Sequence, residues 1–342
     1  MTYFGFPIDA ILIFLAVVCL SVFMDLSAHK RTKEIAFIDA ILWSGLWIGL
    51  ALAFYAYLWV RFDKQWADLY LAGYALEKSL SVDNLMVFMA IFASFGIKGA
   101  LQHRILYLGI IGALVFRAVF VLVGTSLFLA TPWVGFVFGA LVAWSAIQML
   151  KGSGGDDDDI EDYAEHWSVR AVGRLIPIYT KLHLDRLFLT HKELLINGLS
   201  DSVTRKGPFY STPAFLCLAA IETSDIAFSF DSVPAVISVT QQPLLVYAAM
   251  IFAVLGLRSL YFVLSALTRY LVHLEKAVIA LLFFIAARMF LQSWNEVIGD
   301  TGIHIPPDTS LLIVLGTLAT GVAASFLFPN KEDNENVAKV DD

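Results

Sequence analysis

Two long apolar stretches of the chain each carry several carboxylates. The first is EKSLSVDNLMVF at residues 77–88, and the second is ETSDIAFSFDSVPAV at residues 222–236. Aligning their Ser-x-Asp triplets places Asp83 on Asp231 and, six positions earlier, Glu77 on Asp225. The residue after each aspartate adds a neutral oxygen. The two stretches therefore predict one set of oxygen ligands: Glu77, Asp83, Asn84, Asp225, Asp231 and Ser232.

Such a set suits a hard divalent cation. Mg²⁺, Ca²⁺ and Mn²⁺ prefer oxygen ligands, whereas Zn²⁺ and Cu⁺ favour nitrogen and sulfur. Met86 and Met89 would add a thioether that favours Mn²⁺ or Fe²⁺, although such a methionine more often serves packing. Glu222 has no acidic counterpart in the first stretch and is a candidate proton carrier. Asp25 either lines the mouth of the same pathway or ends a helix at the membrane interface.

Four basic residues also fall in apolar sequence: Lys78, Arg117, Arg258 and Arg288. A charge at the bilayer centre costs roughly 2.5–3.5 kcal/mol on insertion scales, so each needs a partner or water. One interpretation is that these cations merely pair with the acids. Apolar residues often stabilise a fold equally well, however, which favours a functional pathway. We expect Lys78, Arg117 and Arg258 to be counter-charges, with the two arginines holding carboxylates when no ion is bound.

The composition indicates that these stretches lie in a membrane. Of the 342 residues, 59% are hydrophobic and 15% are charged, whereas about a quarter of a soluble domain is charged. The excess of apolar residues must face lipid. The net charge of −7 comes partly from an acidic run and an acidic tail, and it does not suggest a nucleic-acid partner. Cys19 and Cys217 lie in apolar sequence, which favours packing over a disulfide or a metal pair.

The hydropathy pattern predicts an all-α polytopic membrane protein with about nine transmembrane helices. Each span needs about 20 residues to cross a bilayer core of about 30 Å. The expected spans are 8–26, 36–60, 69–95, 105–129, 132–150, 213–239, 243–268, 276–294 and 309–328. Most of the 23 lysines and arginines then fall on one side. The positive-inside rule makes that side cytoplasmic, with the N-terminus outside and the C-terminus inside. We expect a multi-pass protein of the inner, cytoplasmic membrane.

The two polar stretches belong to a longer repeat. GALVFRAVF around Arg117 resembles VLGLRSLYF around Arg258, so spans three to five correspond to spans six to eight in the opposite orientation. Inverted repeats of this kind are typical of transporters, whose sites lie near the midplane on broken helices. Pro234 cannot donate a backbone hydrogen bond and therefore predicts a bend or break in span six.

The polar residues divide the chain into four parts. These are spans one to five at 1–150, a cytoplasmic loop at 151–212, spans six to nine at 213–330, and a disordered cytoplasmic tail at 331–342. Within the loop, GSGGDDDDIEDYAEHW is expected to be a solvated linker. SVRAVGRLIPIYTKL is expected to form an amphipathic basic segment on the membrane surface, and a small hairpin is expected near RLFLTHKELLING.

No enzyme is predicted, because the chain has no HExxH, GxSxG or Gly-rich phosphate-loop motif. Instead the sequence resembles the TerC family of integral membrane proteins. The resemblance rests on EKSLSVDNLMVF, QHRILYLGIIGALVFRAVF, ETSDIAFSFDSVPAVISVT and VLGLRSLYFVL, and it extends from about residue 10 to 328. The family is named for tellurium resistance, and several members are linked to manganese efflux. The resemblance therefore implies export of Mn²⁺ or a related divalent ion.

The expected function is a secondary transporter that exports Mn²⁺ or a related cation in exchange for protons at the mid-membrane carboxylates. Mn²⁺ would be the transported ion rather than a fixed cofactor. The expected partners are the divalent ion and the lipid bilayer, and a homo-oligomer is compatible with this interpretation. Two alternatives stay open. One is a non-transporting scaffold that assists insertion or metallation of other proteins, and the other is tellurite-linked detoxification.

Overall fold

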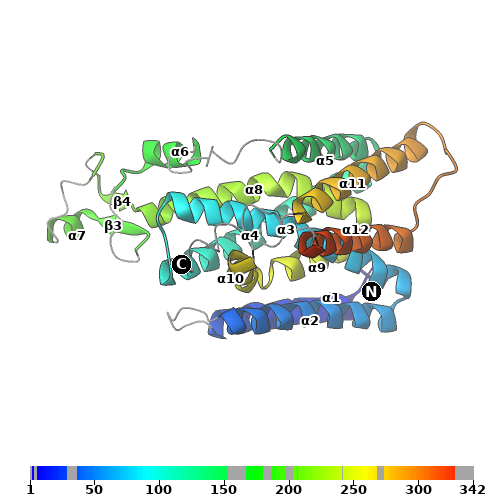
Figure 1. The fold of residues 1–342 in the computed structure, drawn as a ribbon, viewed down its shortest axis with the longest axis horizontal. Helices are drawn as coiled ribbons and strands as arrows, with labels where there is room; N and C mark the ends of the chain where they lie inside the picture. The colour runs from blue at the N-terminus through cyan, green and yellow to red at the C-terminus, as the bar shows by residue number, and fades with distance from the viewer. Residues whose placement is uncertain are drawn as a thin grey trace.

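The computed structural model of the chain is mostly helical (Figure 1). It describes residues 2–3, 6–28, 37–152, 167–179, 186–196, 203–205, 207–240, 242–267 and 273–327. The long helices and their two broken segments are α1 (Ile8–Ala28), α2 (Phe37–Arg61), α3 (Lys64–Ser94), α4 (Ala100–Ala130), α5 (Trp133–Gly152), α8 (Pro213–Thr240), α9 (Pro243–Val254), α10 (Leu257–Leu267), α11 (Leu274–Val297) and α12 (Pro307–Leu327). The short elements are β1 (Thr2–Tyr3), β2 (Phe6–Pro7), α6 (Trp167–Leu175), β3 (Phe188–Thr190), α7 (His191–Ile196) and β4 (Phe209–Ser211).

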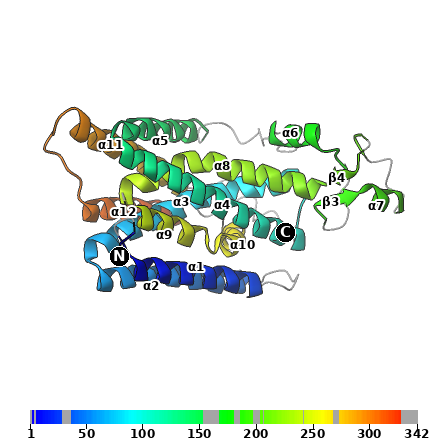
Figure 2. The same cartoon turned by 180° about the vertical axis from the view of Figure 1, so that it is seen from behind.

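The long helices form a bundle with α3 and α8 in its middle. Figures 1 and 2 show α1 and α2 along one edge of the bundle and α5 and α11 along the opposite edge. α3 packs against α2, α8, α9 and α12, and α8 packs against α4 and α5 as well. The two helices that carry the polar stretches are therefore surrounded by other helices.

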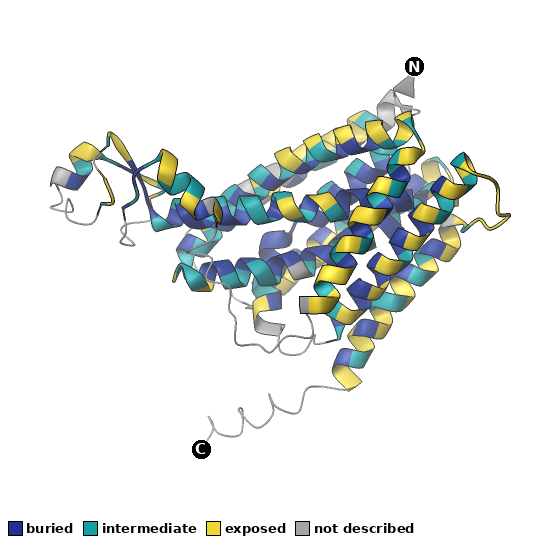
Figure 3. Ribbon diagram, turned by 90° about the horizontal axis from the view of Figure 1, so that it is seen from above, coloured by how far each residue is buried: buried dark blue, intermediate teal, exposed yellow. Residues whose placement is uncertain are grey.

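The outer helices turn apolar side chains away from the bundle. Leu42 of α2, Leu129 of α4 and Leu312 of α12 are 65%, 64% and 73% exposed. Figure 3 shows exposed residues on the outer faces and buried residues between the helices. An apolar surface of this extent is costly in water, so these faces meet lipid. The chain is an integral membrane protein, as its composition predicted.

The described residues contain five helices that are long and apolar enough to cross a bilayer: α2, α4, α5, α8 and α12. α9 and α10 together would make a sixth span, bent by 47° at their junction. α3 carries Asp68, Glu77 and Lys78, which makes it less apolar than these helices. The expected count of nine spans and the orientation of the chain stay predictions.

Of the bend or break expected in the sixth span, the break is wrong and the bend stays a prediction. α8 continues as a helix through Pro234. The interruption lies in the next span instead, between α9 and α10, where Gly256 has a φ of +82°. This region of backbone conformation favours glycine because it has no Cβ. The side chain of Trp47 on α2 occupies the space that a Cβ at this position would need.

The two predicted halves of the repeat pack against each other reciprocally. α4 packs against α8, and α9 packs against α3. The predicted repeat makes α3 equivalent to α8 and α4 equivalent to α9, so a contact between α4 and α8 predicts one between α9 and α3. The inverted repeat itself stays a prediction, since α4 is one helix whereas its counterpart is the broken pair α9–α10.

The bundle has two distinct ends. At one end, which we call the turn end, α2 leads into α3 and α11 leads into α12. Lys64 Nζ of α3 lies 3.8 Å from Asp308 Oδ2 of α12 there. At the other end, the strand end, β3 and β4 project beyond the long helices (Figure 1). Leu189 of β3 pairs with Tyr210 of β4 in an antiparallel register.

The segment between α5 and α8 agrees with the sequence in part. The small hairpin was expected near residues 186–198, which hold β3 and the short helix α7. β3 pairs instead with β4, which lies farther along the chain. α6 forms within the expected amphipathic segment, and its place on a membrane surface stays a prediction. The acidic run at 153–166 and the tail at 331–342 lie outside the described residues.

Candidate functional site

Arg117 of α4 lies at the centre of a buried charge cluster. Its Nη2 donates to Oδ1 of Asp225 at 2.9 Å, and its Nε donates to Oδ2 of the same carboxylate at 3.4 Å. Its Nη1 forms an ion pair with Oε1 of Glu77. The three residues are at most 3% exposed. The structure thus brings the equivalent acids of the two stretches, Glu77 of α3 and Asp225 of α8, to one guanidinium.

The charges of this cluster do not balance. With all three groups ionised, two carboxylates face one guanidinium, which leaves one negative charge in excess. An excess charge in a buried site is unfavourable unless another charge offsets it. A proton or a second cation near Glu77 or Asp225 would therefore stabilise the cluster.

A cavity of about 480 Å³ lies between α3, α5, α8 and α11. Asn84 of α3 lines it together with Asp231 and Ser232 of α8, so the second pair of equivalent segments also shares one space. Further polar and sulfur-containing side chains complete its lining: Ser145, Gln148, Glu275, Met86 and Met149. The cavity therefore offers carboxylate, amide and hydroxyl oxygens with two thioethers nearby.

A hydrogen bond holds the Asp231 carboxylate in this cavity. The backbone N–H of Ser232 donates to Asp231 Oδ1 at 3.0 Å. Ser145 of α5 lines the same cavity and offers a hydroxyl beside the carboxylate. A donor from the backbone of α8 restricts the orientation of the carboxylate, which favours binding of a cation at a fixed place.

Glu222 of α8 lies against α4 at Gly112. A Cβ at Gly112 would overlap the Glu222 carboxylate, so the glycine permits this close approach. Glu222 Oε2 is buried and has no hydrogen-bond partner among the residues that the structure describes. One oxygen of the carboxylate is thus buried between two helices without a donor in the described part of the chain, an environment that suits a proton carrier.

Lys78 contacts the break in the seventh expected span. Its Nζ donates to the carbonyl oxygen of Ala253 at 3.1 Å. Because α9 ends at Val254, the carbonyls of its last turn lack intrahelical donors, and a cation there is favourable. Arg258 lies just beyond the break on α10 and is 4% exposed. That Arg258 holds a carboxylate stays a prediction.

Two of the predicted site residues have side chains outside the described part of the chain. Asp83 belongs to α3 and precedes Asn84, and Asp25 belongs to α1, but the positions of their carboxylates are not defined. Among the described residues, no three His, Cys, Asp or Glu side chains lie close enough together to hold a metal ion. The described ligand atoms of the cavity are consequently those of Asp231, Glu275 and neutral side chains.

The sequence interpretation missed several lining residues of the cavity. Ser145 and Gln148 are polar residues one turn apart in the apolar fifth span, and this spacing was an available signal. Glu275 precedes the expected span 276–294, so the sequence did not indicate it as a site residue. The methionines that line the cavity are Met86 of α3 and Met149 of α5, whereas Met89 does not line it.

Comparisons with known proteins also indicate an integral membrane protein. Residues 62–333 match the model of the integral membrane protein TerC family. The chain is 49% identical to the tellurium resistance protein TerC of Serratia marcescens and 48% identical to that of Alcaligenes sp, in each case over 98% of both chains. It is 35% identical to the chloroplastic thylakoid membrane protein TERC of Arabidopsis thaliana, over 82% of this chain and 66% of that protein. No solved structure matches. On the family match and these identities, the chain belongs to the TerC family of integral membrane proteins.

Proposed function

We propose that the protein is a secondary transporter that exports Mn²⁺ or a related divalent cation from the cytoplasm in exchange for protons. The observation that carries this proposal is the convergence of the two polar stretches. Asn84 and Asp231 line one cavity, and Glu77 and Asp225 share Arg117. Both pairings join α3 to α8. Neither pairing is needed for packing alone, since apolar residues stabilise such contacts equally well.

The cavity has ligands for a divalent cation. The Asp231 carboxylate supplies charge, and Asn84, Ser232 and Gln148 supply neutral oxygens. Mn²⁺ accepts such oxygen ligands. The thioethers of Met86 and Met149 line the same cavity. Asp83, adjacent to Asn84 in the chain, is the further carboxylate that we assign to this ion.

Proton exchange follows from the chemistry of the same acids. A carboxylate must lose its proton to bind a metal ion, so cation binding releases protons. Asp231 and Glu222 are the carboxylates that we assign to this exchange, because Asp225 and Glu77 already share Arg117 as their counter-charge. Arrival of a cation would weaken the hold of Arg117 on its carboxylates through charge repulsion, which links the cavity to the cluster.

The packing of the two halves supports alternating access. Inverted repeats allow one half to rock against the other around a site at their interface. α4 with α8 and α9 with α3 form the reciprocal contacts across which such a movement would occur. We place the turn end outside and the strand end in the cytoplasm of a cell with an inner membrane, on the charge distribution of the sequence.

Transport of Mn²⁺ into or out of proteoliposomes tests the proposal. Asp231→Asn keeps the size of the side chain but removes its charge, and we expect at least a tenfold loss of Mn²⁺ flux. Ser310→Ala on α12, outside the cavity, is the matched control and should keep full flux. Full Mn²⁺ flux in Asp231→Asn would overturn the proposal.

The names of the two most complete matches reported above favour a second candidate, tellurite-linked detoxification. The scaffold alternative also remains. Flux of tellurite but not of Mn²⁺ through the purified protein would support the first. The scaffold alternative would be supported by two results together. The purified protein would move neither ion, and cells that lack it would lose metal from other proteins.

A further inference from the structure

Arg288 is a buried cation that the proposed transport site does not use. It lies on α11, nine residues before Val297, and is 6% exposed. At 1.5 Å per residue it sits roughly 13 Å inside the turn end of this helix. Its Nη1 is buried and has no hydrogen-bond partner in the described part of the chain. A guanidinium in this position needs a counter-charge.

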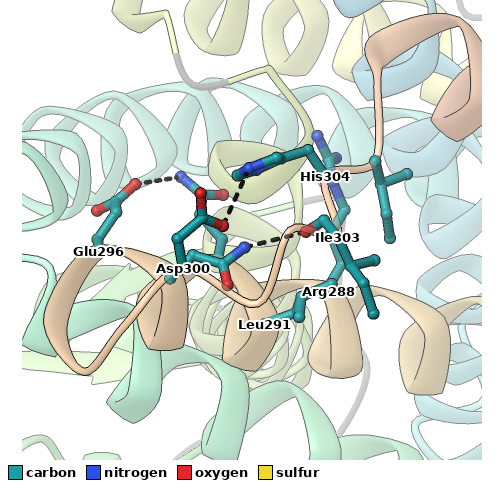
Figure 4. A pocket seen from close by; sticks show the side chains of 9 residues that line it. Arg288, Leu291, Glu296, Asp300, Ile303 and His304 are labelled. Carbon is teal, nitrogen blue, oxygen red and sulfur yellow. Dashed lines mark hydrogen bonds and ion pairs between the residues drawn. The ribbon is translucent and has the colours of Figure 1, made fainter.

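A second cavity, of about 360 Å³, leads from the turn end to Arg288. It lies between the last turns of α11 and the loop that joins α11 to α12. Figure 4 shows Arg288 on α11 reaching toward the part of the loop that carries Ile303 and His304. We call this cavity the turn-end pocket.

The other polar groups of the turn-end pocket already interact with one another. His304 Nε2 lies 3.2 Å from Asp300 Oδ1, and Gln292 Nε2 donates to Glu296 Oε1 at 3.1 Å (Figure 4). Asn295 donates to the carbonyl oxygen of Ile303 at 3.0 Å. The two acids are exposed, so water screens their charge. The buried guanidinium is not screened in this way.

We propose that the turn-end pocket binds a small oxyanion, of the phosphate, sulfate or carboxylate class, through Arg288. The planar fork of a guanidinium matches two oxygens of such a group. The exposed acids at the mouth weaken the binding of an anion without preventing it, because they are paired and in water. These acids also allow a test of the charge of the bound ion, because they would strengthen the binding of a cation and weaken that of an anion.

Binding to the full-length protein in phospholipid-free detergent micelles tests the proposal. Inorganic phosphate and sulfate are titrated by calorimetry at constant ionic strength set with chloride. We expect saturable binding of at least one of them by the wild-type protein. Arg288→Gln should weaken it at least tenfold, because a hydrogen bond to a charged group contributes about 1.5–3 kcal/mol. Arg288→Lys should retain part of the affinity.

Glu296→Gln tests whether the bound ion is an anion. It should tighten oxyanion binding about two- to threefold, as expected for removal of one exposed like charge several ångströms away. Lys64→Gln, an exposed cation at the same end but outside the pocket, should leave binding unchanged.

Three results of these titrations would overturn the proposal. They are absence of saturable phosphate and sulfate binding, equal binding by wild type and Arg288→Gln, and weaker binding in Glu296→Gln. If Arg288→Gln does not fold, the proposal is tested by the affinities of Arg288→Lys, which should be reduced, and of Glu296→Gln, which should be increased. Binding that appears only when vesicles of phosphatidylglycerol replace the inorganic ions would also overturn it, since the ligand would then be a lipid headgroup.

Discussion

The two halves of the predicted repeat use equivalent positions differently. When Arg117 is aligned with Arg258, Val115 of the continuous helix α4 falls on Gly256 at the break between α9 and α10. Val115 is 60% exposed on the outer face, whereas Gly256 has a φ of +82° and packs under Trp47. One half therefore presents an intact helix to its neighbours, and the other presents a helix end with exposed carbonyls.

The charges next to these helices differ accordingly. The same alignment places Gly112 on Ala253. Gly112 contacts the carboxylate of Glu222, and Ala253 accepts a hydrogen bond from Lys78. The intact helix thus meets an acid and the broken helix meets a cation, which offsets the partial negative charge of a helix end. At positions that the predicted repeat makes equivalent, the two halves therefore differ both in backbone and in the charge that each meets.

The largest effect is expected at Arg117. Arg117→Met leaves Glu77 and Asp225 buried without a counter-charge, and loss of one partner of a buried ion pair costs about 3–5 kcal/mol. Thermal unfolding in detergent, followed by tryptophan fluorescence, should therefore shift strongly downward. Adding Glu77→Gln and Asp225→Asn to the same variant should restore most of the stability. An Arg117→Met protein as stable as wild type would show that the cluster is not ionised.

A smaller effect is expected where the two halves differ in backbone. Gly256→Ala forces a Cβ into a left-handed conformation and against Trp47, and we expect a loss of about 1–3 kcal/mol. The matched control is Val115→Ala at the equivalent position of α4, which should change stability by less than about 0.5 kcal/mol because the site faces outward. Equal effects of the two changes in thermal unfolding would contradict the difference between the halves.

Lys78→Met tests the cation at the broken helix. The Ala253 carbonyl would lose its donor, and an unsatisfied buried acceptor costs about 1–3 kcal/mol. Removal of a partly buried charge offsets some of this, so we expect a net loss of about 1 kcal/mol in thermal unfolding. Ile226→Met, at the equivalent position of α8, serves as the control. A gain in stability in Lys78→Met would argue against this contact.

The smallest change in stability is expected at Gly112. Gly112→Ala moves the end of a flexible Glu222 side chain rather than backbone, so the cost should stay below about 1 kcal/mol. If Glu222 carries protons, this displacement should still lower proton-coupled Mn²⁺ flux severalfold, as a pH-sensitive dye in proteoliposomes would report. Ala253→Gly at the equivalent position is the control. Unchanged flux in Gly112→Ala would remove Glu222 from the proton pathway.

The sequence predicted contacts between charges better than it predicted helix geometry. Uncompensated charge in apolar sequence must find a partner, which is why Arg117 could be expected beside carboxylates. Pro234 was expected to interrupt its helix from a local rule, yet α8 accommodates it. The break at Gly256 lies against Trp47 of α2, and this contact cannot be predicted from the local sequence. Ser145 and Glu275 join the cavity for the same reason, since only the packing of α5 and α11 brings them there.

The most direct test of the central claim is anomalous X-ray scattering from crystals grown with Mn²⁺. The account predicts a peak in the cavity between α3 and α8, about 2–2.5 Å from oxygens of the Asp231 carboxylate, that disappears in Asp231→Asn. Absence of a peak at saturating Mn²⁺, or a peak that persists unchanged in Asp231→Asn, would contradict it.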